Sequence, residues 1–66
     1  MMLDRIGNEV KIGQLVTIVN HPEIELKCNW IIEDFIDYGT AIDAVLSNFI
    51  THQVKFISIL DLIKEF

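Results

Sequence analysis

The sequence predicts a small all-β domain, and three observations support this prediction. Branched aliphatic residues dominate the chain: 12 of the 66 residues are isoleucine, and valine and leucine add 11 more. Isoleucine and valine are branched at Cβ, which suits the pleated backbone of a strand. The apolar residues also occur in runs of strand length, and residues typical of turns separate these runs. We expect one domain over residues 1–66.

The first strand is expected after a short N-terminal arm over residues 1–11, which Gly7-Asn8 closes. Gln14–Val19 reads Gln-Leu-Val-Thr-Ile-Val and predicts this strand. Asn20-His21-Pro22 ends it, because proline has a fixed φ and no amide hydrogen. An irregular connection then leads to the next apolar run.

Residues 30–46 predict a β-hairpin that turns at Asp37–Thr40, where Gly39 allows a positive φ. Side chains alternate between the two faces of a strand. One face therefore receives Trp30, Ile32, Ile36 and Tyr38, with Asp34 as an exception among them. The other face receives Ile31, Glu33, Phe35 and Asp37. Ala41–Leu46 continues the alternation, with Ile42, Ala44 and Leu46 on one side.

Asp34 departs from this pattern, because a carboxylate on a core face needs a hydrogen-bonding partner or an opening to solvent. Three interpretations are open. Asp34 lies near the rim of the sheet, or a β-bulge rotates it outward, or it makes a polar contact inside an interface.

The C-terminal third predicts a connection, a fourth strand and a short ending. Ser47–Gln53 mixes polar residues with Phe49 and Ile50 and predicts the connection. Val54–Ile59 predicts the strand. Leu60–Phe66 predicts a short turn followed by a terminal strand or a helical turn.

A helical interpretation competes for the middle of the chain. Apolar residues recur at spacings of four, three, four, three and four, which is a heptad-like pattern: Ile31, Phe35, Tyr38, Ile42, Val45 and Phe49. This pattern predicts an alternative α+β fold with a central helical hairpin. Gly39 opposes it, because glycine inside a helix costs about 1 kcal/mol relative to alanine. The many β-branched residues also favour strands.

Four or five short strands with a long loop after the first resemble a small SH3-like β-barrel, over about residues 12 to 64. The resemblance rests on Gly13–Ile18 as an opening strand, on the hairpin Trp30–Leu46 and on the tail Val54–Leu62. Relatives that bind proline-rich peptides use rows of aromatic side chains, and His21–Asn29 contains none. The resemblance therefore implies an architecture and not a function.

The charge of the chain argues against nucleic-acid binding. Ten acidic residues stand against five basic ones, for a formal net charge of −5. No Lys or Arg occurs from Cys28 to Val54, where Glu33, Asp34, Asp37 and Asp43 lie. Since nucleic-acid binding relies on Lys and Arg that neutralise phosphates, we expect no direct binding. An acidic inhibitor that imitates the charge of nucleic acid is compatible with the same residues.

A soluble, cytoplasmic protein is expected. Cys28 is the only cysteine, and the chain has no Asn-x-Ser/Thr sequon and no signal-peptide profile at its start. The longest uncharged runs have 11 residues, whereas a membrane-spanning helix needs about 20 apolar residues.

No pattern predicts a metal site or a catalytic centre. His21, Cys28 and His52 are not arranged in the closely spaced pairs of zinc sites. Cys28 and Ser47 have no nearby base that would activate them as nucleophiles. A chain of this length also leaves little volume for a substrate pocket. We expect a protein without enzyme activity, without a cofactor and without a small-molecule substrate.

Surface left over from the core is the best predictor of function. A domain of this size buries only roughly 60% of its unfolded surface, so some apolar side chains stay exposed unless another chain covers them. The predicted partner-binding residues are the apolar outer face, the acidic hairpin tip and the neighbouring tryptophan: Trp30, Ile31, Phe35, Asp37, Tyr38, Asp43, Val45 and Phe49. We expect a small interaction or regulatory module that forms a homodimer or binds a protein partner. If the middle of the chain is instead a helical hairpin, the predicted function is a helical oligomerisation element.

Overall fold

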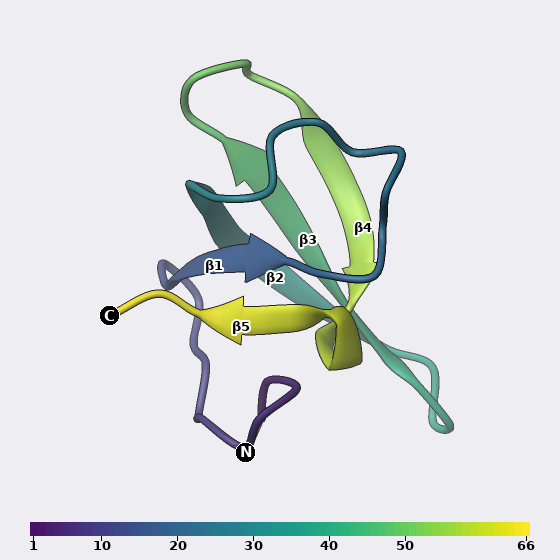
Figure 1. Cartoon of the computed structure of the whole chain (residues 1–66). Coiled ribbons are helices and arrows are strands. Elements are labelled where there is room, and N and C mark those ends of the chain that lie inside the picture. The colour runs from purple at the N-terminus through teal and green to yellow at the C-terminus, as the bar shows by residue number, and fades with distance from the viewer.

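The computed structural model of residues 1–66 contains five antiparallel strands in one open sheet (Figure 1). In chain order they are β1 (Leu15–Ile18), β2 (Trp30–Asp37), β3 (Ile42–Asn48), β4 (Val54–Ser58) and β5 (Leu62–Lys64), and the short 3-10 turn η1 (Ile59–Asp61) joins the last two. The order across the sheet is β4-β3-β2-β1-β5. Figure 1 shows β1 and β5 running across the direction of β3 and β4, so the sheet bends over its core. The all-β prediction is confirmed.

The alternative with a central helical hairpin is wrong, because β2 and β3 pair with each other along their lengths. A two-residue turn makes this pairing possible. The Tyr38 amide donates to the Ala41 carbonyl at 2.9 Å, which leaves Gly39 and Thr40 at the tip. Gly39 has a φ of 89° and Thr40 has no positive φ, the combination found in type II′ turns. The alternative helix would have to continue through Gly39, which forms the tip of this turn.

The core lies inside the bend of the sheet, and ten apolar residues form it: Val10, Val16, Ile18, Ile24, Trp30, Ile32, Ala44, Leu46, Ile57 and Leu62. Trp30 is fully buried among them, and its indole Nε1 donates to the Leu26 carbonyl at 2.8 Å. Burial of the ring with its N–H satisfied is favourable. Trp30 is therefore a core residue and contributes nothing to the exposed surface, in contrast to its place among the predicted partner-binding residues.

A β-bulge at Glu33 interrupts the alternation of β2. Ile32 pairs with Leu46, but the next pair is Asp34 with Val45, so β2 has one residue more than β3 at this point. An extra residue moves every later side chain to the opposite face. Asp34 is exposed on the outer face as a result. Of the three interpretations of Asp34, the one in which a β-bulge rotates it outward is confirmed.

Beyond the bulge, the predicted faces of β2 are exchanged. Phe35 lies opposite the buried Ala44 and packs against the core, although unbroken alternation predicted it on the outer face. Ile36 was predicted for the core and lies opposite Asp43 on the outer face, half-buried. The predicted apolar face of the central hairpin thus loses Phe35 and gains Ile36.

The N-terminal arm packs against the sheet and covers one of its edges. The Arg5 amide donates to the Leu62 carbonyl at 2.8 Å, and the Lys64 amide donates to Oδ2 of Asp4 at 2.7 Å. Val10, at the end of the arm, belongs to the core. The backbone of β5 that faces away from β1 therefore has partners in the arm.

Asp4 is the anchor of this arm and is only 4% exposed. Besides the Lys64 amide, its carboxylate accepts the Ile6 amide and both the amide and side-chain nitrogens of Asn8. Burial alone would raise the pKa of Asp4, but the hydrogen bonds from Lys64 and Asn8 outweigh it and hold the pKa below its ordinary value. The carboxylate is thus the form that binds the arm to β5.

The structure contains no helix with the length and apolarity that a membrane span requires.

Candidate interaction surface

The two edges of the sheet differ. β5 is covered by the arm, whereas β4 pairs only with β3. No backbone hydrogen bond outside the β3–β4 ladder involves residues 54–58. One side of the β4 backbone is therefore without partners in the chain.

The ladder shows which groups of β4 are free. The Asn48 amide donates to the Gln53 carbonyl at 3.0 Å, so the next residues of β4 that bond to β3 are 55 and 57, because bonded positions alternate along an antiparallel strand. The N–H and C=O groups of Val54 and Phe56 and the N–H of Ser58 point away from the sheet, while Ser58 also caps η1. We call this row of groups the free edge.

Several exposed apolar side chains lie on and beside the free edge. The segment from residue 49 to residue 60 contains five of the twelve exposed large apolar side chains, each between 52% and 64% exposed: Phe49, Ile50, Val54, Phe56 and Leu60. Phe56 lies opposite Val45 of β3, which shares the outer face and is half-buried. An apolar strip thus runs from the outer face of β3 to the free edge.

The β3–β4 turn presents two of these side chains on a fixed backbone. Asn48 is 1% exposed, and its Oδ1 accepts the amides of Ile50 and Thr51 at 2.9 and 3.1 Å. Its side-chain nitrogen donates to the Cys28 carbonyl at 3.3 Å. Because the buried Asn48 binds the turn and also the β1–β2 loop at Cys28, Phe49 and Ile50 project from a defined position.

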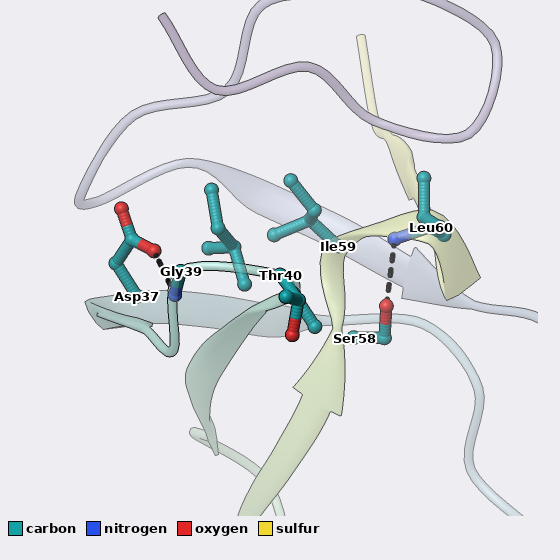
Figure 2. A pocket seen from close by; sticks show the side chains of 8 residues that line it. Asp37, Gly39, Thr40, Ser58, Ile59 and Leu60 are labelled. Atoms are coloured by element: carbon teal, nitrogen blue, oxygen red, sulfur yellow. Dashed lines mark hydrogen bonds between the residues drawn. The ribbon is translucent and has the colours of Figure 1, made fainter.

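At the opposite end of β4, an open hollow of about 310 Å³ lies between the β2–β3 turn and η1 (Figure 2). Its apolar lining comes from Ala41, Ile42, Ile59 and Leu60. Figure 2 shows Asp37 on the side of the β2–β3 turn, where its Oδ1 accepts the Gly39 amide at 2.7 Å. On the other side the Ser58 hydroxyl accepts the Leu60 amide at 3.2 Å, which fixes the start of η1.

The charges near the free edge are few. β2 and β3 together carry four acids, whereas the only charged residue of β4 is Lys55. Asp43 of β3 lies opposite Ser58 at the end of the strand, and Glu23 and Glu25 of the β1–β2 loop line a shared depression with Lys55. The free edge itself is therefore acid-free in a chain of net charge −5.

The ion pairs of the molecule form a separate cluster, where the β1–β2 loop meets η1. His21 contacts Glu23 Oε1 through Nδ1 at 2.9 Å and Asp61 Oδ2 through Nε2 at 3.0 Å. Arg5 also approaches Asp61, at 3.9 Å. The hydrogen bond to Glu23 raises the pKa of His21, partial burial opposes this, and the bond to Asp61 adds to the rise. A protonated ring can donate to both carboxylates at once, so the cluster favours the charged histidine.

The residues predicted to bind a partner are spread over several places. Val45 lies on the outer face beside Phe56, Asp43 lies opposite Ser58, and Phe49 is exposed in the turn before β4. Ile31 is half-buried on the outer face, opposite Ser47. Asp37 and Tyr38 are exposed at the hairpin tip, and Asp37 reaches the hollow. Phe35 and Trp30 point into the core.

Val54 and Phe56, at the centre of the surface, are not among the residues predicted to bind a partner. Their alternation with Lys55 and Ile57 shows that they share a face. Nothing local in the sequence indicates that their strand lies at an edge. Ile50 and Leu60 were likewise not singled out for binding.

His21, Cys28 and His52 do not assemble into a metal site. The structure has no group of three or more His, Cys, Asp or Glu side chains placed to hold a metal ion.

Comparison of the chain with protein-family models, curated proteins and solved structures gave no match.

Proposed function

We propose that this protein is a small, non-enzymatic interaction module of SH3-like architecture that pairs the free edge of β4 with the same strand of a second copy. The strand order and the short 3-10 turn between β4 and β5 support the SH3-like assignment. One observation carries the proposed function: β4 combines a free edge with the exposed side chains of Val54 and Phe56, whereas the arm covers the other edge.

An uncovered strand edge is a template for another strand. Proteins usually blunt such an edge with proline, a bulge, charged side chains or a covering segment. β4 has no proline, no register shift and one lysine. It retains the features that favour pairing.

A second copy is the partner that the apolar β4 strand favours, although the net charge of the chain opposes self-association. Two copies of a chain with net charge −5 repel each other, and the acid-free edge of β4 is where close approach avoids contact between acids. Because the free groups lie at residues 54, 56 and 58, antiparallel pairing over all five residues of β4 places Phe56 opposite Phe56 of the second copy. Val54 then lies opposite Ser58.

Analytical ultracentrifugation of the wild type, Phe56→Lys and the control Ile12→Lys tests this proposal. Both residues are exposed to a similar degree, 59% and 63%, but Ile12 lies in the N-terminal arm. We expect dimers for the wild type and Ile12→Lys, and monomers for Phe56→Lys at the same chain concentration.

The size of the expected effect follows from the exposed area of Phe56. With 59% of the side chain exposed and roughly 200 Å² for a whole phenylalanine, about 120 Å² per copy is available for burial. At about 25 cal/mol per Å² this gives about 3 kcal/mol per copy as an upper value. If half of the area becomes buried in both copies, the loss is about 3 kcal/mol, or about a hundredfold in Kd.

Amide hydrogen exchange provides a second readout. In the dimer, the outward amides of Val54, Phe56 and Ser58 should be protected in a concentration-dependent manner, whereas those of Lys55 and Ile57 are protected by β3 at every concentration. A wild type that remains monomeric at about 1 mM, where even an interaction of about −4 kcal/mol forms half of the complex, refutes the proposal. Dimerisation that disappears with added salt would instead indicate a charge-dependent contact.

A further inference from the structure

We infer that, in the edge-paired dimer, each copy places Phe49 and Ile50 of its β3–β4 turn in the hollow between the β2–β3 turn and η1 of the other copy. This inference rests on the proposed function, because pairing of β4 with β4 is what brings the two regions together. It adds a second, apolar contact at each end of the paired strands.

The direction of pairing determines which parts meet. The β3–β4 turn precedes Val54, and the hollow is built partly from the residues that follow at the other end of β4, Ser58 to Leu60. In an antiparallel pair with Phe56 opposite Phe56, residues 50–53 of one copy continue past Ser58 of the other, toward η1. Two-fold symmetry repeats the contact at the second end.

The chemistry of the two parts is complementary. Phe49 and Ile50 are 52% and 57% exposed, and Leu60 at the rim of the hollow is 64% exposed. Ile42 and Ile59 extend the apolar lining inward. All five side chains lose unfavourable contact with water if the turn fills the hollow.

The area needed for a stable dimer also favours this contact. With roughly 100 Å² of exposed area for each large apolar side chain, Val54 and Phe56 provide about 400 Å² over two copies. Specific interfaces bury about 1,000 Å² or more. Adding Phe49, Ile50 and Leu60 of both copies raises the apolar total to about 1,000 Å² on the same basis. The β4 strands alone fall short, and the turn and the hollow supply the remainder.

The backbone of the β3–β4 turn is already ordered in the single chain. Asn48 holds the backbone amides of Ile50 and Thr51 before any partner arrives, so the turn loses little conformational freedom on binding.

Isotope-filtered NMR on a mixture of labelled and unlabelled chains tests the inference directly. We expect intermolecular NOEs between Phe56 side chains, and a second set from Phe49 and Ile50 to Ile59 and Leu60. A dimer that shows the first set and lacks the second overturns the inference and leaves the proposed function intact. A chain that sediments as a monomer overturns both.

Affinity measurements on variants supply an independent test. The double variant Phe49→Ser/Ile50→Ser should weaken dimerisation by at least about tenfold, and Ala41→Phe, which fills the hollow from the exposed β2–β3 turn, should do the same. Ile6→Ser is the control, because Ile6 is 64% exposed in the arm. Circular dichroism confirms that each variant is folded. Folded turn and hollow variants that dimerise as tightly as Ile6→Ser contradict the inference.

Discussion

Asn48 allows a quantitative test of how the β3–β4 turn is built. Its side chain is buried and makes three hydrogen bonds, accepting the Ile50 and Thr51 amides and donating to the Cys28 carbonyl. The substitution Asn48→Ala removes all three bonds and leaves their partners without these contacts. No other side chain bonds to the Ile50 amide, the Thr51 amide or the Cys28 carbonyl.

The expected cost follows from these three contacts. A protein hydrogen bond contributes about 1 kcal/mol net, and a buried group left unpaired costs about 1–3 kcal/mol. All three bonds are part-buried, so water reaches the groups that Asn48 leaves unpaired only in part. We expect a loss of about 2–3 kcal/mol, which in a domain of this size lowers Tm by about 10–20 °C.

Thermal unfolding followed by circular dichroism measures this loss. All variants must be compared at one chain concentration, because the proposed dimerisation would make Tm depend on concentration. Thr51→Ala is the control in the same turn, since the Thr51 hydroxyl only accepts the Gln53 amide at 3.4 Å, and it should change stability by less than about 0.5 kcal/mol. The reasoning is refuted if Asn48→Ala melts within about 3 °C of the wild type, or if Thr51→Ala costs as much.

Three further predictions concern the rest of the fold. The pKa of His21 is raised above 6.5. The stability that its charged form provides is therefore present below pH 6.5 and lost as the pH rises through the raised value. His21→Gln should flatten that part of a plot of Tm against pH. The pKa of Asp4 is lowered below 3.8. The stability that its carboxylate provides is therefore present above pH 3.8 and lost as the pH falls through the lowered value. Asp4→Ala should speed hydrogen exchange of the Lys64 amide already at neutral pH. Gly39→Ala should cost about 1–2 kcal/mol in thermal unfolding, because φ is 89° at this position.

Each of these predictions has a matched control. Gln53→Asn, which removes no titratable group from the exposed β3–β4 turn, should retain the wild-type dependence of Tm on pH near neutrality, and an identical loss in both variants would contradict the assignment to His21. Glu9→Ala, on the exposed part of the arm, should leave exchange of the Lys64 amide unchanged. Thr40→Ala, at the neighbouring turn position, should be less costly than Gly39→Ala; equal costs would show that the backbone conformation is not responsible.

The strand positions were predictable because they depend on local chemistry. The β-branched runs form strands, and the two-residue turn at Gly39 decides in favour of a hairpin over the heptad-like spacing. The faces of β2 were predictable only as far as Glu33. The bulge there depends on how β2 aligns with β3, which is a property of two segments together, so Phe35 and Ile36 were assigned to the wrong sides.

The candidate surface was harder to predict from the sequence, because it too depends on how separate segments are arranged in the sheet. Val45 and Phe49 were identified as apolar residues outside the core, and both lie beside the free edge. Val54 and Phe56 acquire their importance from the position of β4 at the end of the sheet, which follows from the order of all five strands. Trp30 could bind a partner only if it were exposed, and it is buried in the core; composition alone does not distinguish these two positions of an aromatic ring.

The carboxylate of Asp4 has a consequence for how large an assembly can become. A sheet that grows by strand addition at both sides forms a fibre, whereas one that accepts a strand at one side only stops at two copies. In the proposed dimer, the arm over β5 would stop growth at two copies. If β4 pairs as proposed, acid or loss of Asp4 would weaken the cover over β5, because the bond from the Lys64 amide is then lost, and would favour the addition of further copies at that side.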